Sequence, residues 1–137
     1  MTVFVDSSAW FAMMVKRDRN NARAKAVLQS DHERVTTDHV LVETWLLLNA
    51  RVRQGAGDAF WAYLRKGAAR VEKVLPADLE TAWKIGTDFP DQEFSIVDRT
   101  SFVVMERLSI SRAASFDDDF AVYRFGPGRK RAFEVLR

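Results

Sequence analysis

The sequence predicts an α/β fold, a three-layer sandwich in which helices flank a central, mostly parallel sheet. Short β-branched and aromatic runs alternate along the chain with longer segments of helical periodicity, and this alternation is typical of parallel sheets with crossover helices. The chain has 137 residues, of which 47% are hydrophobic, and this suits one packed domain over residues 1–137. No repeat or change of composition indicates a second domain.

The first half of the chain alternates two expected strands with helices. Residues 2–5 (TVFV) have the composition of a buried strand, and the following Asp6, Ser7 and Ser8 are residue types that cap helices. The remaining elements of this half, in chain order, are helices over 9–16 and 20–30, a strand over 34–37 and a helix over 38–53. An acid therefore stands where the first strand ends and the first helix begins.

The helix over 38–53 is apolar on nearly every side between Val40 and Leu48, so we expect it to lie deep in the fold. Glu43 stands inside this apolar stretch, and no basic residue lies three or four positions from it. Buried carboxylates are rare unless they are paired or bound to a metal. Glu43 is therefore a candidate ligand, and the alternative is a solvent-facing stripe on this helix.

The second half of the chain continues the alternation. Its expected elements, in chain order, are a helix over 57–69, a strand over 70–74, helices over 77–89 and 95–108, a strand over 111–115 and a last strand over 130–136. On the helix over 77–89, the spacing of Leu79, Ala82, Trp83 and Gly86 places them on one face.

Two more acids stand near predicted element ends. Asp117 follows the fourth strand as Asp6 follows the first, and the carboxyl ends of parallel strands share the edge where ligands bind. Asp98 lies near the start of the helix that Ser95 opens. Each acid also has a structural interpretation: Asp6 and Asp117 can cap helices, and Ser95 with Asp98 forms a capping-box pattern. Alone, none of them indicates a function.

Taken together, Asp6, Glu43, Asp98 and Asp117 are expected at one edge of the sheet. Carboxylates gathered in one place repel each other unless a cation offsets them. Hard oxygen ligands suit Mg²⁺ or Mn²⁺, and such an ion can activate water and stabilise charge that builds on a phosphodiester. The sequence has no cysteine, no G-x-S-x-G and no phosphate-binding loop motif, so other hydrolytic chemistries lack support.

Charge and hydropathy indicate which ligands and which cellular location to expect. The net charge of +2 is compatible with a polyanionic ligand, and the basic residues are clustered. The clusters are Lys16, Arg17 and Arg19; Arg51 and Arg53; Arg65, Lys66 and Arg70; and Arg129, Lys130 and Arg131. The first residues do not form a signal peptide and no apolar stretch is long enough to span a membrane, so we expect a soluble protein, and the lack of cysteine fits the cytoplasm.

Four motifs together resemble a PIN domain of the VapC-type toxins. They are VFVDSSAWFAM, VTTDHVLVETWLLL, FSIVDRTSFVVMERLSI and ASFDDDF, in the family's order and over nearly the whole chain. The resemblance implies a Mg²⁺- or Mn²⁺-dependent endoribonuclease in which Asp6, Glu43, Asp98 and Asp117 form the acidic quartet. Asp6, Asp98 and Asp117 would hold the metal. Asp119 resembles an accessory acid of some members.

Some positions depart from the family pattern or stay open. Ser115 stands where many members have Thr, a change that keeps the hydroxyl, and Arg99 occupies a position that is often small. Arg99 has two interpretations, a phosphate contact or an ion pair with a neighbouring acid.

The resemblance also implies partners: an RNA substrate, a cognate antitoxin that blocks the acidic site, and a second copy in a homodimer. Trp10, Phe11 and Trp45 are expected to line an apolar surface beside the acids, where an amphipathic antitoxin helix could dock. The alternative is that these aromatics, or at least one of them, belong to the ordinary core. Two alternatives remain open. One is a non-catalytic RNA-binding or interaction module, and the other is a housekeeping nuclease that acts on DNA or RNA without an antitoxin.

Overall fold

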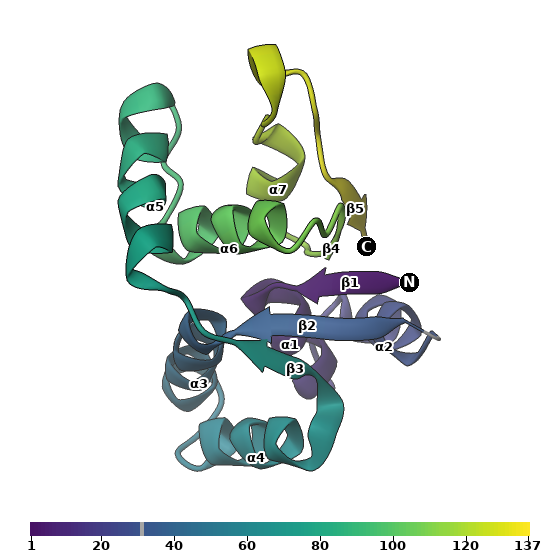
Figure 1. Cartoon of the computed structure of the whole chain (residues 1–137). Coiled ribbons are helices and arrows are strands. Elements are labelled where there is room, and N and C mark those ends of the chain that lie inside the picture. Colours follow the sequence, from purple (N-terminus) through teal and green to yellow (C-terminus); the bar gives the residue numbers. More distant parts are fainter. Residues whose placement is uncertain (31) are drawn as a thin grey trace.

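The computed structural model of the chain describes residues 1–30 and 32–137. Its strands are β1 (Thr2–Val5), β2 (Glu33–Thr37), β3 (Arg70–Glu72), β4 (Arg112–Ala114) and β5 (Glu134–Leu136). Its helices are α1 (Ser7–Met14), α2 (Asn21–Gln29), α3 (Asp38–Arg51), α4 (Ala56–Tyr63), α5 (Pro76–Asp88), α6 (Ile96–Arg107) and α7 (Asp119–Val122), with a π-helical turn η1 (Leu64–Ala68) and a 3₁₀ turn η2 (Pro127–Arg129). Figure 1 shows the helices packed around the sheet, which confirms the predicted α/β sandwich.

The sheet is parallel throughout the described strands, in the order β3-β2-β1-β4-β5. The chain builds outward from β1 through β2 to β3, and then returns to the other side of β1 with β4 and β5. This reversal makes the gap between β1 and β4 a topological switch point, where the connections leave the strands in opposite directions. A ligand-binding crevice is expected beyond the carboxyl ends of these two strands, next to Val5 and Ala114.

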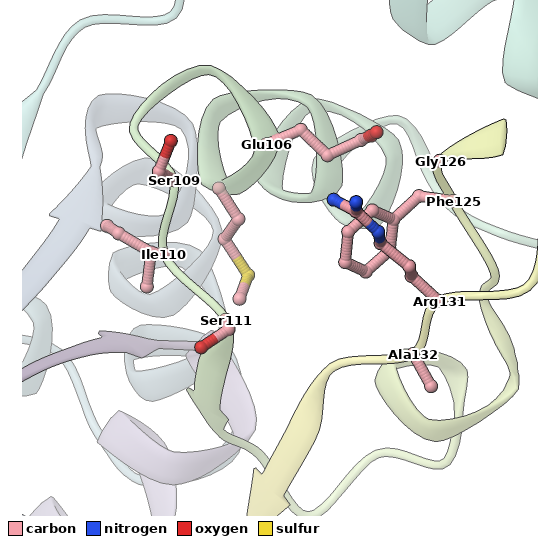
Figure 2. Close-up of a pocket in the computed structure, with 9 residues that line it drawn as sticks. Glu106, Ser109, Ile110, Ser111, Phe125, Gly126, Arg131 and Ala132 are labelled. Carbon is pink, nitrogen blue, oxygen red and sulfur yellow. The ribbon is translucent and has the colours of Figure 1, made fainter.

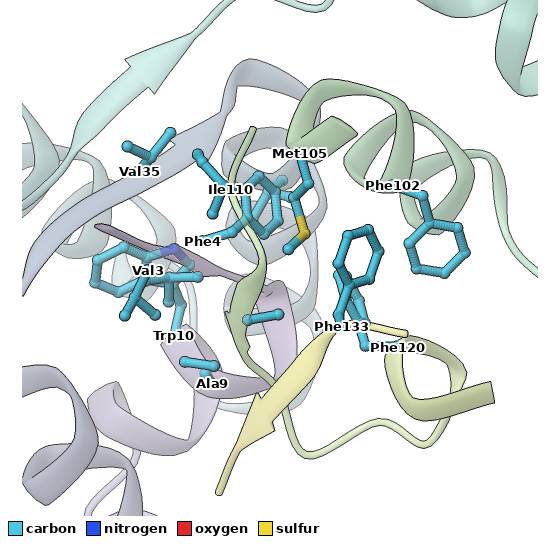
Figure 3. Packing of buried hydrophobic residues seen from close by; sticks show 14 of the residues in the cluster. Val3, Phe4, Ala9, Trp10, Val35, Phe102, Met105, Ile110, Phe120 and Phe133 are labelled. Carbon is cyan, nitrogen blue, oxygen red and sulfur yellow. The ribbon is translucent and has the colours of Figure 1, made fainter. Parts of the chain in front are cut away.

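The core is formed where β1 meets the aromatic residues of both halves of the chain (Figure 3). Val3, Phe4 and Val5 are almost completely buried, as expected for a central strand covered on both faces. Trp10 belongs to this core as well, because it is only 1% exposed and packs against Phe60. The expectation that Trp10 lines a docking surface is therefore wrong, and the alternative that it is an ordinary core residue is correct.

The position of α3 also differs from the sequence-based expectation. Only Val40, Thr44 and Leu48 of this helix are buried, whereas Val42 is 55% and Leu46 is 56% exposed. The helix packs one face against its neighbours, and its other apolar side chains remain at the surface. The apolar run of α3 thus includes an exposed face. The expectation of a deeply buried helix is wrong, and the alternative of a solvent-facing stripe on this helix agrees with the structure.

Several element ends differ because the backbone leaves the helix early. Val15 has φ −104° and ψ 102°, so α1 ends at Met14 instead of Lys16. The expected helix over 57–69 closes with η1, in which Gly67 has φ 95° and breaks the helical path. None of the helices in the described part of the chain is long and apolar enough to cross a membrane.

Candidate active site

Asp6 is held at the carboxyl end of β1 by contacts from both sides of the switch point. Its backbone N–H donates to the carbonyl of Ala114 at 3.0 Å, which ties it to the end of β4. Its Oδ2 accepts hydrogen bonds from the Ser8 hydroxyl at 2.8 Å and from the Ser115 hydroxyl at 2.9 Å. Asp6 is 2% exposed and also caps α1, since the Ser8 N–H points to the same carboxylate.

Asp98 stands in the first turn of α6, at the same edge. The Asp98 N–H donates to the Ser95 hydroxyl at 3.0 Å, and the Ser95 N–H donates to Asp98 Oδ2 at 3.2 Å, which completes a capping box. The capping interpretation of Asp98 is therefore correct, but it does not exclude a second role for this carboxylate. Asp98 is 6% exposed, and in the described chain no Arg or Lys forms an ion pair with it.

Asp117 and Asp119 come from the turn that leads from β4 into α7. The Asp117 N–H donates to the Ser115 hydroxyl at 3.1 Å, and the Asp119 N–H donates to Asp117 Oδ1 at 3.0 Å. These bonds fold the turn so that Asp98, Asp117 and Asp119 each offer a carboxylate oxygen, and the three atoms lie within 4.8 Å of one another. Asp118 is exposed and pairs with Arg137 at 2.9 Å, so it lies outside this group.

Glu43 faces the same region from α3. It is partly buried, and its Oε1 accepts a hydrogen bond from the Ser7 hydroxyl, which lies 3.5 Å from Asp6 Oδ1. A serine from α1 therefore links Glu43 to Asp6. The spacing of Glu43 on its own helix could not reveal this partner, because Ser7 lies 36 positions earlier in the chain.

The electrostatics of the site are those of crowded acids. Burial, with the Asp119 carboxyl beside it and the charges of Asp6 and Asp117, raises the pKa of Asp98 to about 8. Burial also raises the pKa of Asp6 to about 6, with a smaller contribution from Glu43, although the Ser8 and Ser115 hydroxyls oppose this rise. The pKa of Asp119 is raised too, mainly by burial and then by the charge of Asp117. A proton or another cation is therefore bound favourably here.

A cleft of about 520 Å³ opens over these acids, and Glu43, Asp98, Asp117 and Asp119 all line it. Asp18 and Asn20 form one wall and Arg51, at the end of α3, contributes a cation. A second cavity, of about 480 Å³, lies beside the carboxyl end of α6 and the start of β4 (Figure 2). Its single acid, Glu106, accepts a hydrogen bond from the Tyr123 hydroxyl, so this cavity lacks the group of acids that a hard cation requires.

The donor set over the first cleft fits a divalent metal ion. Three carboxylate oxygens within 4.8 Å of one another can share one cation, and the raised pKa values of Asp98 and Asp119 show that negative charge is unfavourable there. Mg²⁺ and Mn²⁺ prefer such oxygen ligands. Sequence reasoning gave Asp119 only an accessory place, because the turn that brings it to Asp98 has no recognisable pattern beyond three consecutive acids.

The chain belongs to the PIN domain family, whose model matches residues 3–126. The resemblance seen in the four motifs is thereby confirmed. The relatives described next are VapC-type toxins, the group that the motifs resemble.

The sequence is 41% identical over 125 residues to the 23S rRNA-specific endonuclease VapC20 in two strains of Mycobacterium tuberculosis, across 90% of this chain and 95% of the relative. The fold is similar to the crystal structure of M. tuberculosis VapC20, described as a sarcin–ricin loop cleaving toxin. That match has a TM-score of 0.83 and 38% identity over 87% of this chain and 92% of the other.

Proposed function

We propose that this protein is a metal-dependent endoribonuclease, the toxin of a toxin–antitoxin pair. The observation that carries the proposal is the group of convergent carboxylates from Asp98, Asp117 and Asp119 in an open cleft, in a chain of the PIN domain family. A non-catalytic module would gain nothing from crowding acids that raise each other's pKa.

Asp98, Asp117 and Asp119 would hold Mg²⁺ or Mn²⁺. Asp6 lies outside this group of three, but its charge acts on Asp98, and it would be a further ligand. When bound, such an ion supplies charge that polarises a phosphodiester and lowers the pKa of water. Ser8 and Ser115 fix the orientation of Asp6 through its Oδ2. Glu43, held by Ser7, would accept a proton from the attacking water at the free part of its carboxylate.

The proposed substrate is the 23S rRNA, at its sarcin–ricin loop, because the similar endonuclease is named for 23S rRNA and the similar crystal structure is described by the sarcin–ricin loop. Cations on the rim would hold the phosphate backbone. Arg51 lines the cleft, and Lys16, Arg17 and Arg19 are exposed on the loop that also carries Asp18 into its wall. Binding that depends on such contacts weakens as salt is raised.

The experiment is a cleavage assay on ribosomes, on a sarcin–ricin loop hairpin and on DNA of the same sequence. Cleavage of the RNA with Mg²⁺ or Mn²⁺, and its loss in EDTA, is the expected result. Cleavage of DNA at a similar rate would favour the housekeeping nuclease, and no cleavage of any substrate would favour the non-catalytic module.

A cognate antitoxin is the second proposed partner, and the apolar face of α3 is its proposed docking surface. Leu41, Val42, Trp45 and Leu46 line an apolar pocket of about 300 Å³ together with Trp61 of α4. A neighbouring apolar pocket also includes Glu43, so a helix docked on α3 would end at the acidic cleft. An arginine from this partner could then form charge-assisted hydrogen bonds with the carboxylates.

Co-expression with the product of the neighbouring gene tests this partner. The neighbour is expected to co-purify with this protein and to relieve the growth arrest that this protein causes when it is expressed in the cytoplasm. Trp61→Ala is expected to weaken both effects. A homodimer, which the family suggests, is expected by light scattering. A neighbour that neither binds nor relieves arrest would leave a nuclease without an antitoxin.

A further inference from the structure

Trp83 of α5 is the most exposed large hydrophobic side chain in the described part of the chain, at 75%. An indole ring left in water at a helix surface is unfavourable unless it serves a contact, and exposed Trp residues are frequent anchors of binding sites. Trp83 lies one turn after Leu79 on α5, but this face of the helix is not buried, because the helix faces the core through Ala82 and Ile85. The ring is therefore available to a ligand.

A guanidinium group lines the same pocket as this ring and is anchored by a hydrogen bond. Arg99 of α6 donates from Nε to the carbonyl of Phe94 at 2.9 Å, and its Nη atoms make no hydrogen bond or ion pair with the described residues. Of the two interpretations of Arg99 open from sequence, the ion pair with a neighbouring acid is absent among these residues. One edge of the guanidinium is anchored and the other is free to bind.

Gly86 makes room for this arrangement. A Cβ atom at Gly86 would lie 2.4 Å from Arg99 Nη1 and 2.9 Å from Cζ, so any larger residue would displace the guanidinium. Trp83, Gly86, Thr87 and Arg99 line a pocket of about 370 Å³, here named the Trp83 notch. It combines an aromatic face, a fixed cation and a hydroxyl in a space of small-ligand size.

We propose that the Trp83 notch binds one unstacked base of the RNA substrate on the Trp83 ring, with an adjoining phosphate on the Arg99 guanidinium. This inference rests on the proposed function and adds a recognition subsite to it. Proteins that bind single-stranded or looped RNA stack splayed bases on aromatic rings and hold phosphates with arginine forks. A nucleotide is the ligand that uses both parts of the notch at once.

The notch and the cleft that would cut the RNA each include a residue from the first turn of α6. Arg99 directly follows Asp98 on α6, and consecutive helical residues differ by about 100° around the axis. The acid and the guanidinium therefore face neighbouring sides of one helical turn, within reach of one RNA strand. A phosphate near the acidic cluster is repelled, so a cationic contact just outside it would improve binding and position the strand.

A protein ligand is the competing occupant, and the charge distribution favours RNA. An apolar helix from a partner would leave the free Nη groups of Arg99 desolvated and without an acceptor, which is costly. The α3 surface, in contrast, is lined almost entirely by apolar side chains around Trp45 and Trp61. The two exposed tryptophans thus provide a matched pair for experiment.

The test compares Trp83→Ala with Trp61→Ala, which removes a 47% exposed indole from α4. On a sarcin–ricin loop hairpin, Trp83→Ala is expected to raise KM roughly 10- to 100-fold, the effect of losing one stacked base, while kcat changes little. Trp83→Phe is expected to restore most of the binding. Trp61→Ala is expected to leave KM unchanged.

A series of hairpins with single abasic positions shows whether a base is the ligand. Removal of the bound base should weaken binding to the wild type, and should weaken binding to Trp83→Ala no further. The proposal would be overturned by an unchanged KM for Trp83→Ala. It would also be overturned if every abasic position weakened binding to Trp83→Ala as much as it weakens binding to the wild type.

Two further outcomes are separable. If Trp83→Ala instead abolishes self-association or antitoxin binding while KM for RNA is unchanged, the surface binds protein and the inference is wrong. If the wild type cuts no RNA, the proposed function itself has failed. A wild type that cuts RNA with a normal KM for Trp83→Ala would refute the notch alone.

Discussion

Asp78 and Asp98 are the same residue type in the same helical position, with opposite surroundings. Each lies three residues after its N-cap, each is at most 6% exposed, and each accepts a hydrogen bond from the N-cap backbone N–H. Arg107 donates to both carboxylate oxygens of Asp78, at 3.0 and 2.9 Å, and lowers the pKa of that group although burial opposes it. Asp98 is surrounded by acids, and its pKa is raised to about 8.

The difference separates a structural acid from a candidate functional one. The chain supplies a cation to Asp78 from α6, so that carboxylate is satisfied by folding alone. Around Asp98 the chain supplies Asp6, Asp117 and Asp119. Capping and burial are thus common to both residues, and the sign of the neighbouring charges is what indicates chemistry.

The sharpest way to break this comparison is to neutralise each acid in turn. Asp98→Asn is expected to reduce RNA cleavage by more than about 100-fold, since replacing even an outer-sphere partner of a metal ligand costs 10- to 100-fold. Its fold should persist, because the amide oxygen can still accept from the Ser95 N–H. Asp78→Asn should leave cleavage per folded molecule near that of the wild type. Rates measured on purified variants of verified fold decide this.

For stability, unlike cleavage, the larger loss is expected for Asp78→Asn. Asp78→Asn is expected to lower the free energy of unfolding by about 1.5–3 kcal/mol, the range for hydrogen bonds to charged groups. Asp98→Asn should have little effect or a stabilising one without metal, because the amide is neutral among the acids without having to take up a proton. Urea denaturation measures both values. Normal cleavage by Asp98→Asn would reduce Asp98 to a helix cap and contradict the proposed site.

Metal addition should sharpen the contrast. Mn²⁺ is expected to raise the melting temperature of the wild type by several degrees at saturating concentration, because a ligand that binds only the folded state stabilises it. Asp78→Asn should show the full increase, and Asp98→Asn or Asp6→Asn little of it. Thermal denaturation with and without EDTA provides the measurement. An equal increase in all variants would place the ion elsewhere.

The smallest expected effect is on the pH dependence of metal-free stability. A carboxyl with a higher pKa in the folded state holds its proton more tightly there, so protonation stabilises the folded state. This contribution to stability is full below the ordinary pKa of 3.8. It is lost as pH rises through about 6 for Asp6 and about 8 for Asp98. In EDTA the wild type should therefore lose stability between about pH 5 and 9. Asp98→Asn should flatten this fall, and a wild type that gains stability over that range would contradict the raised pKa values.

The sequence was sufficient for the parts of the site that depend on strand ends. Asp6 and Asp117 could be placed because an acid directly after a parallel strand has few places to go, and Asp98 because its serine cap marks a helix start. Glu43 could be selected because it interrupts an apolar run, although its hydroxyl partner Ser7 comes from a distant element. Whether the four acids form the working site stays a prediction.

Features that depend on tertiary packing were not accessible from the sequence. The apolar stretch of α3 could not decide between a buried helix and a solvent-facing stripe, since the exposed Val42 and Leu46 are the same residue types as those of a core. Trp10 and Trp83 both lie on predicted helices next to apolar residues, yet one is 1% and the other 75% exposed. The contact of Arg99 with Gly86 joins two helices and has no local signature.

The strand order has a consequence for the synthesis of the protein. Asp6 and Asp117 meet only when β4 pairs with β1, and the residues between them are almost the entire chain. At translation speeds of roughly 5–20 residues per second, several seconds or more pass between the incorporation of the first acid and the last. A nascent chain on the ribosome therefore has no assembled site until its last elements emerge. For an enzyme proposed to cut ribosomal RNA, this order of assembly protects the ribosome that is making it.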